Sequence, residues 1–411
     1  MNALQERFRR RRTGRMSMVL AAGCLVVALA LAACGSDSKD SKSSGGGGGG
    51  SKAAINIGNI SALTGPILLP FGAQGAKAYF DALNKAGGIN GRKVNYIVAD
   101  DKTDPTAASQ QARKLVQQSN VVGFAGGVSL VDCTVNGKFY QQQKVANVMG
   151  GASDPTCFTN PMISPVNTGV LTGVTAGLYY MGKTLGQVPS CTLNNNIPTI
   201  NDAYGGAISR YEQLTGQKVG FQTHAVTPNS NLTTLMLQVK KANCKSLVAT
   251  FSGAQVPALV KAIKQVGWKG GLLLGGASYV ASTPKSLGAD GEGVYTTSEL
   301  FPFTSNDPIL DPVKKDLKAD NVELTGLTEA GWLSAKIMAD TLKTIKGDIT
   351  KASVLAALQK LTSYDTSGLT AQPYAFGPGN AHNPNQAIWP VVIKNGDWDP
   401  AATKFSTLPS S

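Results

Sequence analysis

The sequence predicts an α/β protein with two domains, each built on a parallel β-sheet. Short apolar or alternating runs of strand length recur along the chain, and segments with helical spacing separate them. Strands that are separated by helices of this length pair in parallel, with helices on both faces of the sheet. Residues 53–411 are too many for one ordinary domain and suit two.

The first strand–helix–strand unit is the clearest. Residues 54–60 alternate as a strand, residues 72–86 have helical spacing, and residues 94–99 form a second strand. A further helix begins after Asp104, which is an N-cap residue followed by proline at the first helical position. Beyond this unit we expect strands at 121–125, 145–150, 197–200, 218–223, 246–251 and 271–274, and helices at 105–118, 131–142, 170–184, 204–214, 231–242 and 254–266.

Residues 1–33 have the pattern of a bacterial lipoprotein signal peptide. Six arginines and one glutamate precede an uncharged, mostly apolar run, and Leu31-Ala32-Ala33-Cys34 forms a lipobox. Cys34 is therefore expected to be the lipidated first residue of an extracytoplasmic protein that is anchored to the cell membrane. An uncleaved signal anchor is the alternative, because the apolar run approaches the length of a membrane span. The arginines also allow twin-arginine export.

Residues 34–52 predict a flexible tether. The segment is rich in serine, lysine and glycine, and Gly45–Gly50 are six glycines in a row. After Cys34 it carries no apolar side chain that a folded core could bury. The folded body is therefore expected to begin near residue 53.

The charge argues against a nucleic-acid partner. Removal of residues 1–33 takes away six arginines and one glutamate, which lowers the formal net charge from +13 to +8. The remaining lysines are scattered, and the protein is expected to be exported. We interpret the basic surface as suited to anionic lipid.

Four cysteines remain in the folded body: Cys133, Cys157, Cys191 and Cys244. An even number in an exported protein suggests two disulfides. The spacings match no zinc motif and the chain has only two histidines, so we expect no metal site. Three pairings are possible. We favour Cys133 with Cys157 and Cys191 with Cys244, because each pair then lies within one of the two expected domains.

Five loops are the candidates for ligand binding. In parallel sheets, ligands bind outside the carboxyl ends of the strands, where helix N-termini point. Glycine in such loops lets backbone N–H groups approach a ligand, although the same residues also serve as ordinary helix caps. The loops are 61–72, 126–131, 150–155, 201–205 and 275–279.

Six short motifs follow one another along almost the whole body: Leu63-Thr64-Gly65-Pro66, Gly87-Gly88-Ile89-Asn90-Gly91-Arg92, Asp100-Asp101-Lys102-Thr103-Asp104-Pro105, Gly151-Ala152-Ser153-Asp154-Pro155, Asp202-Ala203-Tyr204-Gly205 and Val266-Gly267-Trp268. Each motif alone is weak, but their order is specific. This composite pattern resembles the branched-chain amino-acid-binding family, the type I periplasmic binding proteins that serve ABC transporters.

The resemblance implies two Rossmann-like lobes joined by three crossovers near residues 166, 297 and 362, which close on a ligand by hinge motion. Lobe 1 would comprise residues 53–166 and 298–362, and lobe 2 residues 167–297 and 363–411. It also implies a monomer that needs no cofactor and that hands a small solute to ABC permease subunits.

The resemblance also implies roles for individual residues. Phe71 would pack on the ligand, the Ser129 and Ser153 hydroxyls with neighbouring N–H groups would bind its carboxylate, and Tyr204 would close over it from the second lobe. Ala277, with Ser278 beside it, stands where amino-acid binders carry an acid for the ligand ammonium.

The missing acid affects the expected ligand. A buried ammonium without a counter-charge costs several kcal/mol. A neutral or monoanionic organic ligand, such as an amide or a carboxylic acid, is therefore favoured over a zwitterionic amino acid, unless Asp202 or another acid reaches the ligand.

The sequence leaves two other classes of function open. A sensory receptor that presents its ligand to a membrane kinase would share the fold. A secreted α/β hydrolase is disfavoured, because the sequence has no GxSxG motif, P-loop or paired-histidine motif. Asp100 and Asp101 are adjacent at a strand end and point to opposite faces, so we interpret them as solvated loop acids rather than as a catalytic pair.

Overall fold

The computed structural model describes residues 53–65, 67–197, 200–376 and 385–409. The predicted signal peptide, Cys34 and the predicted tether lie outside these residues, as do Pro66 and Pro198. Among the described helices, none combines the length and the apolar character that a membrane crossing requires.

The first sheet has five parallel strands within the described residues, in the order β2-β1-β3-β4-β5. Its register places Ile57 opposite Tyr96 on one side and Gly123 on the other. The strands are β1 (Ile55–Ser61), β2 (Val94–Asp100), β3 (Gly123–Ala125), β4 (Asn147–Met149) and β5 (Ile163–Pro165).

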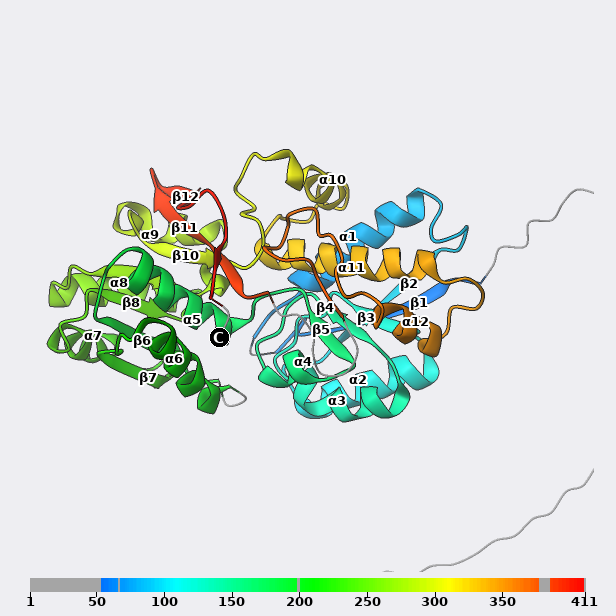
Figure 1. Cartoon of the computed structure of the whole chain (residues 1–411), viewed down its shortest axis with the longest axis horizontal. Coiled ribbons are helices and arrows are strands. Elements are labelled where there is room, and N and C mark those ends of the chain that lie inside the picture. Colours follow the sequence, from blue (N-terminus) through cyan, green and yellow to red (C-terminus); the bar gives the residue numbers. More distant parts are fainter. Residues whose placement is uncertain (1–52, 66, 198–199, 377–384, 410–411) are drawn as a thin grey trace, which may run out of the picture. The chain divides into compact units, whose positions relative to one another are not determined.

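Helices cover both faces of the first sheet (Figure 1). On one face, α1 and α11 pack with α12 around a core that contains Phe80, Trp332 and Met338. On the other face, α2 and α3 enclose Phe124 and Tyr140. The helices are α1 (Phe71–Lys85), α2 (Pro105–Arg113) with its π-helical extension η1 (Lys114–Gln118), α3 (Asp132–Gln143), α4 (Pro155–Thr159), α10 (Asp311–Ala319), α11 (Gly326–Thr344) and α12 (Lys351–Leu358).

The second sheet follows the order β12-β11-β10-β9-β8-β6-β7, and β13 pairs with β11. Strands β7, β6, β8, β9 and β10 are parallel, whereas β11, β12 and β13 add an antiparallel edge that the sequence did not lead us to expect. The strands are β6 (Ser190–Asn195), β7 (Phe221–Val226), β8 (Ser246–Ala249), β9 (Gly271–Leu274), β10 (Tyr295–Ser298), β11 (Ala387–Lys394), β12 (Asp397–Pro400) and β13 (Ser406–Thr407).

The second sheet is also covered on both faces. One core holds Tyr204 and Leu273 beneath α5 and α6, and the other holds Phe251 and Trp268 beneath α7 and α8. Helices therefore cover both faces of both sheets, which confirms the α/β fold class that the sequence predicts. The elements are α5 (Val170–Tyr179) with η2 (Tyr180–Thr184), α6 (Asn201–Thr215), α7 (Leu232–Lys241), α8 (Gln255–Val266), α9 (Ser282–Leu287) and the short 3₁₀ turns η3 (Gly276–Ser278), η4 (Gly288–Gly291) and η5 (Pro308–Leu310).

The prediction of a strand at 197–200 is wrong. The strand before α6 is β6, whose Cys191 and Leu193 are fully buried. The Ile200 N–H instead donates to the Ile197 carbonyl at 3.0 Å, in a turn that leads into α6. The two apolar residues therefore belong to a helix entry and not to a strand.

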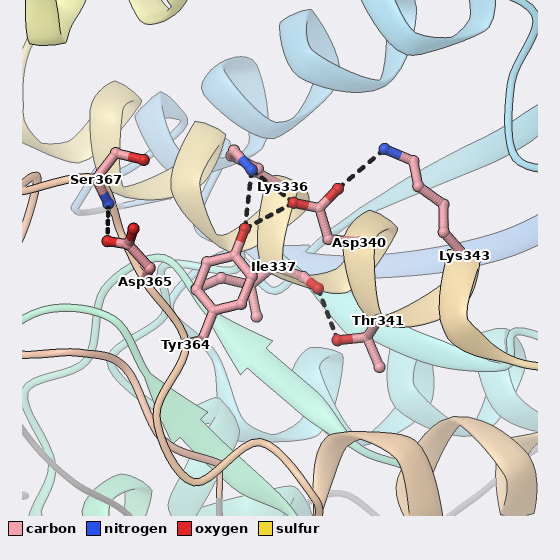
Figure 2. A network of polar contacts seen from close by, with 8 residues as sticks. All are labelled: Lys336, Ile337, Asp340, Thr341, Lys343, Tyr364, Asp365 and Ser367. Carbon is pink, nitrogen blue, oxygen red and sulfur yellow. Dashed lines mark hydrogen bonds and ion pairs between the residues drawn. The ribbon is translucent and has the colours of Figure 1, made fainter.

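Residues 364–376 pack with the first sheet. Tyr374 and Phe376 belong to its core, and the Ser164 hydroxyl donates to the Ala375 carbonyl at 3.1 Å. Figure 2 shows the Tyr364 hydroxyl donating to Asp340 on α11, at 2.7 Å. The next strand of the second sheet begins at Ala387. We therefore propose lobe 1 to extend through Phe376, beyond the boundary near residue 362 that we expected.

The segments that connect the two sheets are held together around Glu299. Its carboxylate accepts a hydrogen bond from the Asn167 amide at 2.7 Å, and its carbonyl accepts one from the Asn385 amide, also at 2.7 Å. The Thr168 hydroxyl adds a bond to the Ala387 carbonyl at 2.6 Å. Burial raises the pKa of Glu299, and the Asn167 bond opposes that rise. One residue, through its side chain and its main-chain carbonyl, thus links all three connections.

The described residues contain two disulfides, one in the part built on the first sheet and one in the part built on the second. Cys133 on α3 is joined to Cys157 on α4, with Cα atoms 5.2 Å apart, and Cys191 on β6 is joined to Cys244 beyond α7, with Cα atoms 5.9 Å apart. These are the two pairs that we favoured from the sequence.

Candidate ligand site

The loop that follows β1 is fixed by Asp100. The Asp100 carboxylate accepts backbone N–H bonds from Leu63 at 2.9 Å and Thr64 at 3.2 Å, and a hydroxyl bond from Thr64 at 2.5 Å. Burial raises the pKa of Asp100, but these hydrogen bonds outweigh it and hold the pKa below its ordinary value. A loop predicted to bind ligand is therefore pinned beside the end of β2.

Asp101 is not the solvated loop acid that we expected. It is fully buried, and one of its oxygens accepts the Thr103 N–H at 2.7 Å. Burial raises the pKa of Asp101, and the Ser129 side chain opposes that rise. The expectation of solvation failed because a strand-end position gives no information on which tertiary neighbours cover it.

Ser129 lies in the loop after β3 and is 3% exposed. Its hydroxyl oxygen accepts the N–H groups of Val131 at 3.2 Å and Asp132 at 3.0 Å, which are at the start of α3. This hydroxyl already caps a helix. Its predicted contact with a ligand stays a prediction.

Ser153 differs from Ser129 because its hydroxyl makes no hydrogen bond to any described residue. The loop around this half-buried serine is itself ordered: the Ala152 N–H donates to the Asn167 side chain at 3.0 Å, and the Asp154 side chain caps α4 through the Thr156 N–H at 2.7 Å. Ser153 is thus held at a defined place with its hydroxyl available.

Phe71 is the first residue of α1 and is half-buried. Its neighbour Gly72 lies so close to the end of β3 that an added Cβ would come within 2.4 Å of the Gly126 carbonyl oxygen and of the Val128 side chain. The start of α1 therefore lies against the loop that leads to Ser129. The structure brings these two predicted site residues into one neighbourhood.

Tyr204 lies in the core of the second sheet. It is fully buried on α6, and its ring stacks on His224 with centroids 5.6 Å apart. Its hydroxyl meets no partner at hydrogen-bond geometry among the described residues. Burial raises its pKa, and the Thr250 side chain opposes that rise. Its predicted role as a cover over the ligand stays a prediction.

Ala277 and Ser278 form the short turn η3 after β9. Ala277 is exposed, whereas Ser278 is fully buried and its hydroxyl donates to the Phe251 carbonyl at 2.6 Å. The next residue, Tyr279, packs on Phe303 with ring centroids 4.1 Å apart. The chain therefore presents only the small Ala277 side chain at the position where the resemblance leads us to look for an acid.

Glu329 is the residue that the sequence reasoning missed. It lies in the first turn of α11, is fully buried, and neither of its carboxylate oxygens has a hydrogen-bond partner among the described residues. Burial raises its pKa well above the ordinary value. A glutamate directly before the small and apolar run Ala330-Gly331-Trp332-Leu333 was the signal that could have found it, because helices buried on all sides rarely carry an unpaired acid.

Two other features of the described residues bear on the site. A hollow of about 450 Å³ beside α10 contains none of the predicted site residues and is lined by Lys314, Leu317, Lys318, Asn321, Val322, Glu323 and Leu324. The described residues also hold no cluster of three or more histidine, cysteine or acidic side chains that suits a metal ion.

The fold and the converging strand-end loops define a binding protein of the two-lobed α/β class. A family model described as periplasmic binding protein matches residues 54–397, so the chain belongs to that family, within its branched-chain amino-acid-binding type I group.

Individual relatives are distant. The Leu/Ile/Val-binding protein homolog 7 of Brucella abortus is 21% identical over 354 residues, which is 79% of this chain and 85% of that protein. A match to an amino acid binding protein of Pseudomonas aeruginosa is local: it is 30% identical over 88 residues, 21% of this chain and 24% of that protein.

Solved structures share the fold along most of the chain. A possible leucine/isoleucine/valine-binding protein from Rhodopirellula baltica has a TM-score of 0.73 at 19% identity and covers 85% of this chain and 96% of its own. A branched-chain amino acid transporter substrate-binding protein from Streptococcus pneumoniae, in complex with isoleucine, has a TM-score of 0.71 at 15% identity and covers 86% and 99%.

Proposed function

We propose that this protein captures a small organic solute outside the cytoplasm and delivers it to the permease of an ABC importer. The observation that carries the proposal is the convergence of four backbone segments at the carboxyl ends of the first sheet's strands: the start of α1, the loops after β3 and β4, and the first turns of α11. An added Cβ on Gly331 would come within 2.0 Å of the Gly72 carbonyl oxygen, and one on Gly150 within 3.1 Å of the Gly126 carbonyl oxygen. Such strand ends are the usual ligand sites of α/β sheets.

The proposed ligand is an amino acid, an amide or a carboxylic acid. The Ser153 hydroxyl, which makes no hydrogen bond to a described residue, would serve a carboxylate or a similar acceptor, and the half-buried Phe71 at the start of α1 would provide apolar surface. A few polar anchors on a mostly apolar wall are typical of small-molecule sites. Membership of the family supports this choice of ligand class.

A thermal-shift screen of residues 53–411 against amino acids, their amides and matched carboxylic acids tests solute binding directly. A ligand present at 100 times its dissociation constant stabilises the folded state by about 2.7 kcal/mol. Ser153→Ala should weaken binding of a carboxylate ligand by about 1–3 kcal/mol, while Ser129→Ala should mainly lower stability through the lost helix cap. If no compound of these classes raises the melting temperature, the proposed function fails.

Lipid anchoring through Cys34 completes the proposed function, because a tethered receptor stays near its permease. Cys34→Ser should move the protein from the membrane fraction to the soluble fraction, without a change in the ligand affinity of residues 53–411. Fractionation that leaves the Cys34→Ser protein on the membrane to the same extent as the wild type would contradict lipidation at this cysteine.

A further inference from the structure

Glu329 is a buried acid with no structural partner. Its side chain is 0% exposed, and both carboxylate oxygens are without a donor among the described residues. Native proteins rarely leave a buried polar group unpaired, and a buried carboxyl without partners costs stability. A residue that is costly to the fold in this way needs another reason to be present, and ligand binding is the common one.

The backbone beside Glu329 touches the loops of the proposed site. An added Cβ on Gly75 would come within 1.9 Å of the Thr328 carbonyl oxygen, and one on Gly151 within 3.2 Å of the Leu327 side chain. Residues 327–331 therefore lie between the start of α1, which carries Phe71, and the loop that carries Ser153. Glu329 belongs to the same first turn of α11, whose backbone touches these loops.

The charge of Glu329 also reaches Tyr279, a core residue beside the second sheet. Burial raises the pKa of Tyr279, the Thr304 hydrogen bonds oppose that rise, and the charge of Glu329 adds to it. Tyr279 directly follows Ala277 and Ser278. Glu329 on α11 is thus a candidate for the acid that is missing at Ala277.

We propose that Glu329 provides the negative charge that pairs with an ammonium group of the solute. The inference rests on the proposed function and narrows its ligand class to organic solutes that carry both an ammonium and a carboxylate, with Ser153 at the carboxylate end. It reverses the preference for an amine-free ligand, which depended on finding no acid to replace the one absent at Ala277.

Asp101 is the rival acid. It is also fully buried, and one of its oxygens meets no hydrogen-bond partner among the described residues, but the other accepts the Thr103 N–H. Glu329 has no such bond on either oxygen. An incoming ammonium has three N–H donors and gains most from a carboxylate whose oxygens are both unused. Glu329 is therefore the better match.

The experiment measures dissociation constants for the common L-amino acids and, for each one that binds, for the analogue in which hydrogen replaces the ammonium. The proteins are residues 53–411 of the wild type, Glu329→Gln and the matched control Glu323→Gln, whose glutamate is exposed and lies six residues before Glu329, outside α11. Glu329→Gln should lose affinity for the amino acid on the order of 100-fold, the usual effect of removing one partner of a buried charge pair.

The same variant should bind the amine-free analogue as well as the wild type does, and Glu323→Gln should bind both compounds like the wild type. A merely structural role would lower the affinity for both compounds alike, which would overturn the inference. Loss of amino-acid affinity in Asp101→Asn but not in Glu329→Gln would assign the ammonium to the rival acid and also overturn it.

Two further results separate the inference from the proposed function. If only amine-free acids or amides bind the wild type, the role of Glu329 is wrong while solute binding stands. If no compound of either kind binds, the proposed function is contradicted, and the inference with it.

Discussion

Two fully buried acids, Asp132 and Glu329, differ in what surrounds them. The Asp132 carboxylate accepts bonds from the Tyr140 hydroxyl at 2.7 Å, the Asn136 amide at 2.8 Å and the Asn147 amide at 3.3 Å. Glu329 has no donor on either oxygen among the described residues. Burial raises the pKa of both groups, to about 6 for Asp132 and well above the ordinary value for Glu329.

The difference separates a structural acid from a candidate binding acid. Asp132 accepts hydrogen bonds from three buried side chains, which offset part of its desolvation inside the fold. Glu329 gains nothing from its neighbours, so the fold would be at least as stable with an apolar side chain in its place. The comparison therefore yields opposite predictions for the two residues.

The largest expected effect is on stability. Asp132→Ala leaves the Tyr140, Asn136 and Asn147 donors buried without an acceptor, and should lower the free energy of unfolding by about 4 kcal/mol. Glu329→Met should leave it unchanged or raise it by about 1 kcal/mol. Urea unfolding of residues 53–411 measures both. An equal loss in the two variants would remove the distinction between them.

The disulfide beside Asp132 should have the next largest effect. Cys133 and Cys157 are separated by 24 residues, and replacing both with serine should lower the free energy of unfolding by about 3 kcal/mol in the chain-entropy description. Urea unfolding before and after the double substitution measures it. An unchanged midpoint, or free thiols at these positions in the exported protein, would show that the bond makes no such contribution.

The pH dependence of stability provides a third test. Because burial raises the pKa of Asp132 from 3.8 to about 6, the folded state binds this proton more tightly than the unfolded state does. Its contribution is therefore fully present below pH 3.8 and is lost as the pH rises to about 6. Asp132→Asn cannot ionise and should flatten this fall. Parallel stability curves for the two proteins between these pH values would contradict the assignment.

The smallest effect is expected at the outer face of α11. Tyr364→Phe removes the hydroxyl that donates to Asp340 at 2.7 Å and accepts from Lys336 at 2.9 Å, as Figure 2 shows. The free energy of unfolding should fall by about 1 kcal/mol, and solute binding should not change. A loss of affinity without a loss of stability would mean that residues 364–376 act on the ligand site and not only on the packing of lobe 1.

The regular elements follow from local patterns. Residues 54–60 alternate in polarity and form β1, and Asp104 caps α2 as its side chain predicts, by accepting the Ala107 N–H. The segment 197–200 failed because apolar residues three apart suit a turn before a helix as well as a strand. The antiparallel edge β11–β12 was not predicted, because strand direction depends on partners far away in the sequence.

The site is less predictable than the fold. The resemblance points to Phe71 and Ser153, which follow β1 and β4, the two strands on either side of β3. It does not show that the Ser129 hydroxyl already caps α3, or that Asp101 is buried. Glu329 was missed for the same reason. Tertiary contacts decide whether a charged side chain is paired, and the sequence around Glu329 is that of an ordinary buried helix.

Proton release on binding tests the role of Glu329 most directly. Because burial raises its pKa, the free carboxyl holds its proton more tightly than an exposed glutamate does, and an arriving ammonium should displace that proton. Calorimetric titration of an amino-acid ligand near neutral pH, in two buffers with different ionisation enthalpies, should give different binding enthalpies for the wild type and equal ones for Glu329→Gln. Equal enthalpies in both buffers for the wild type, with its affinity retained in Glu329→Gln, would contradict the assignment.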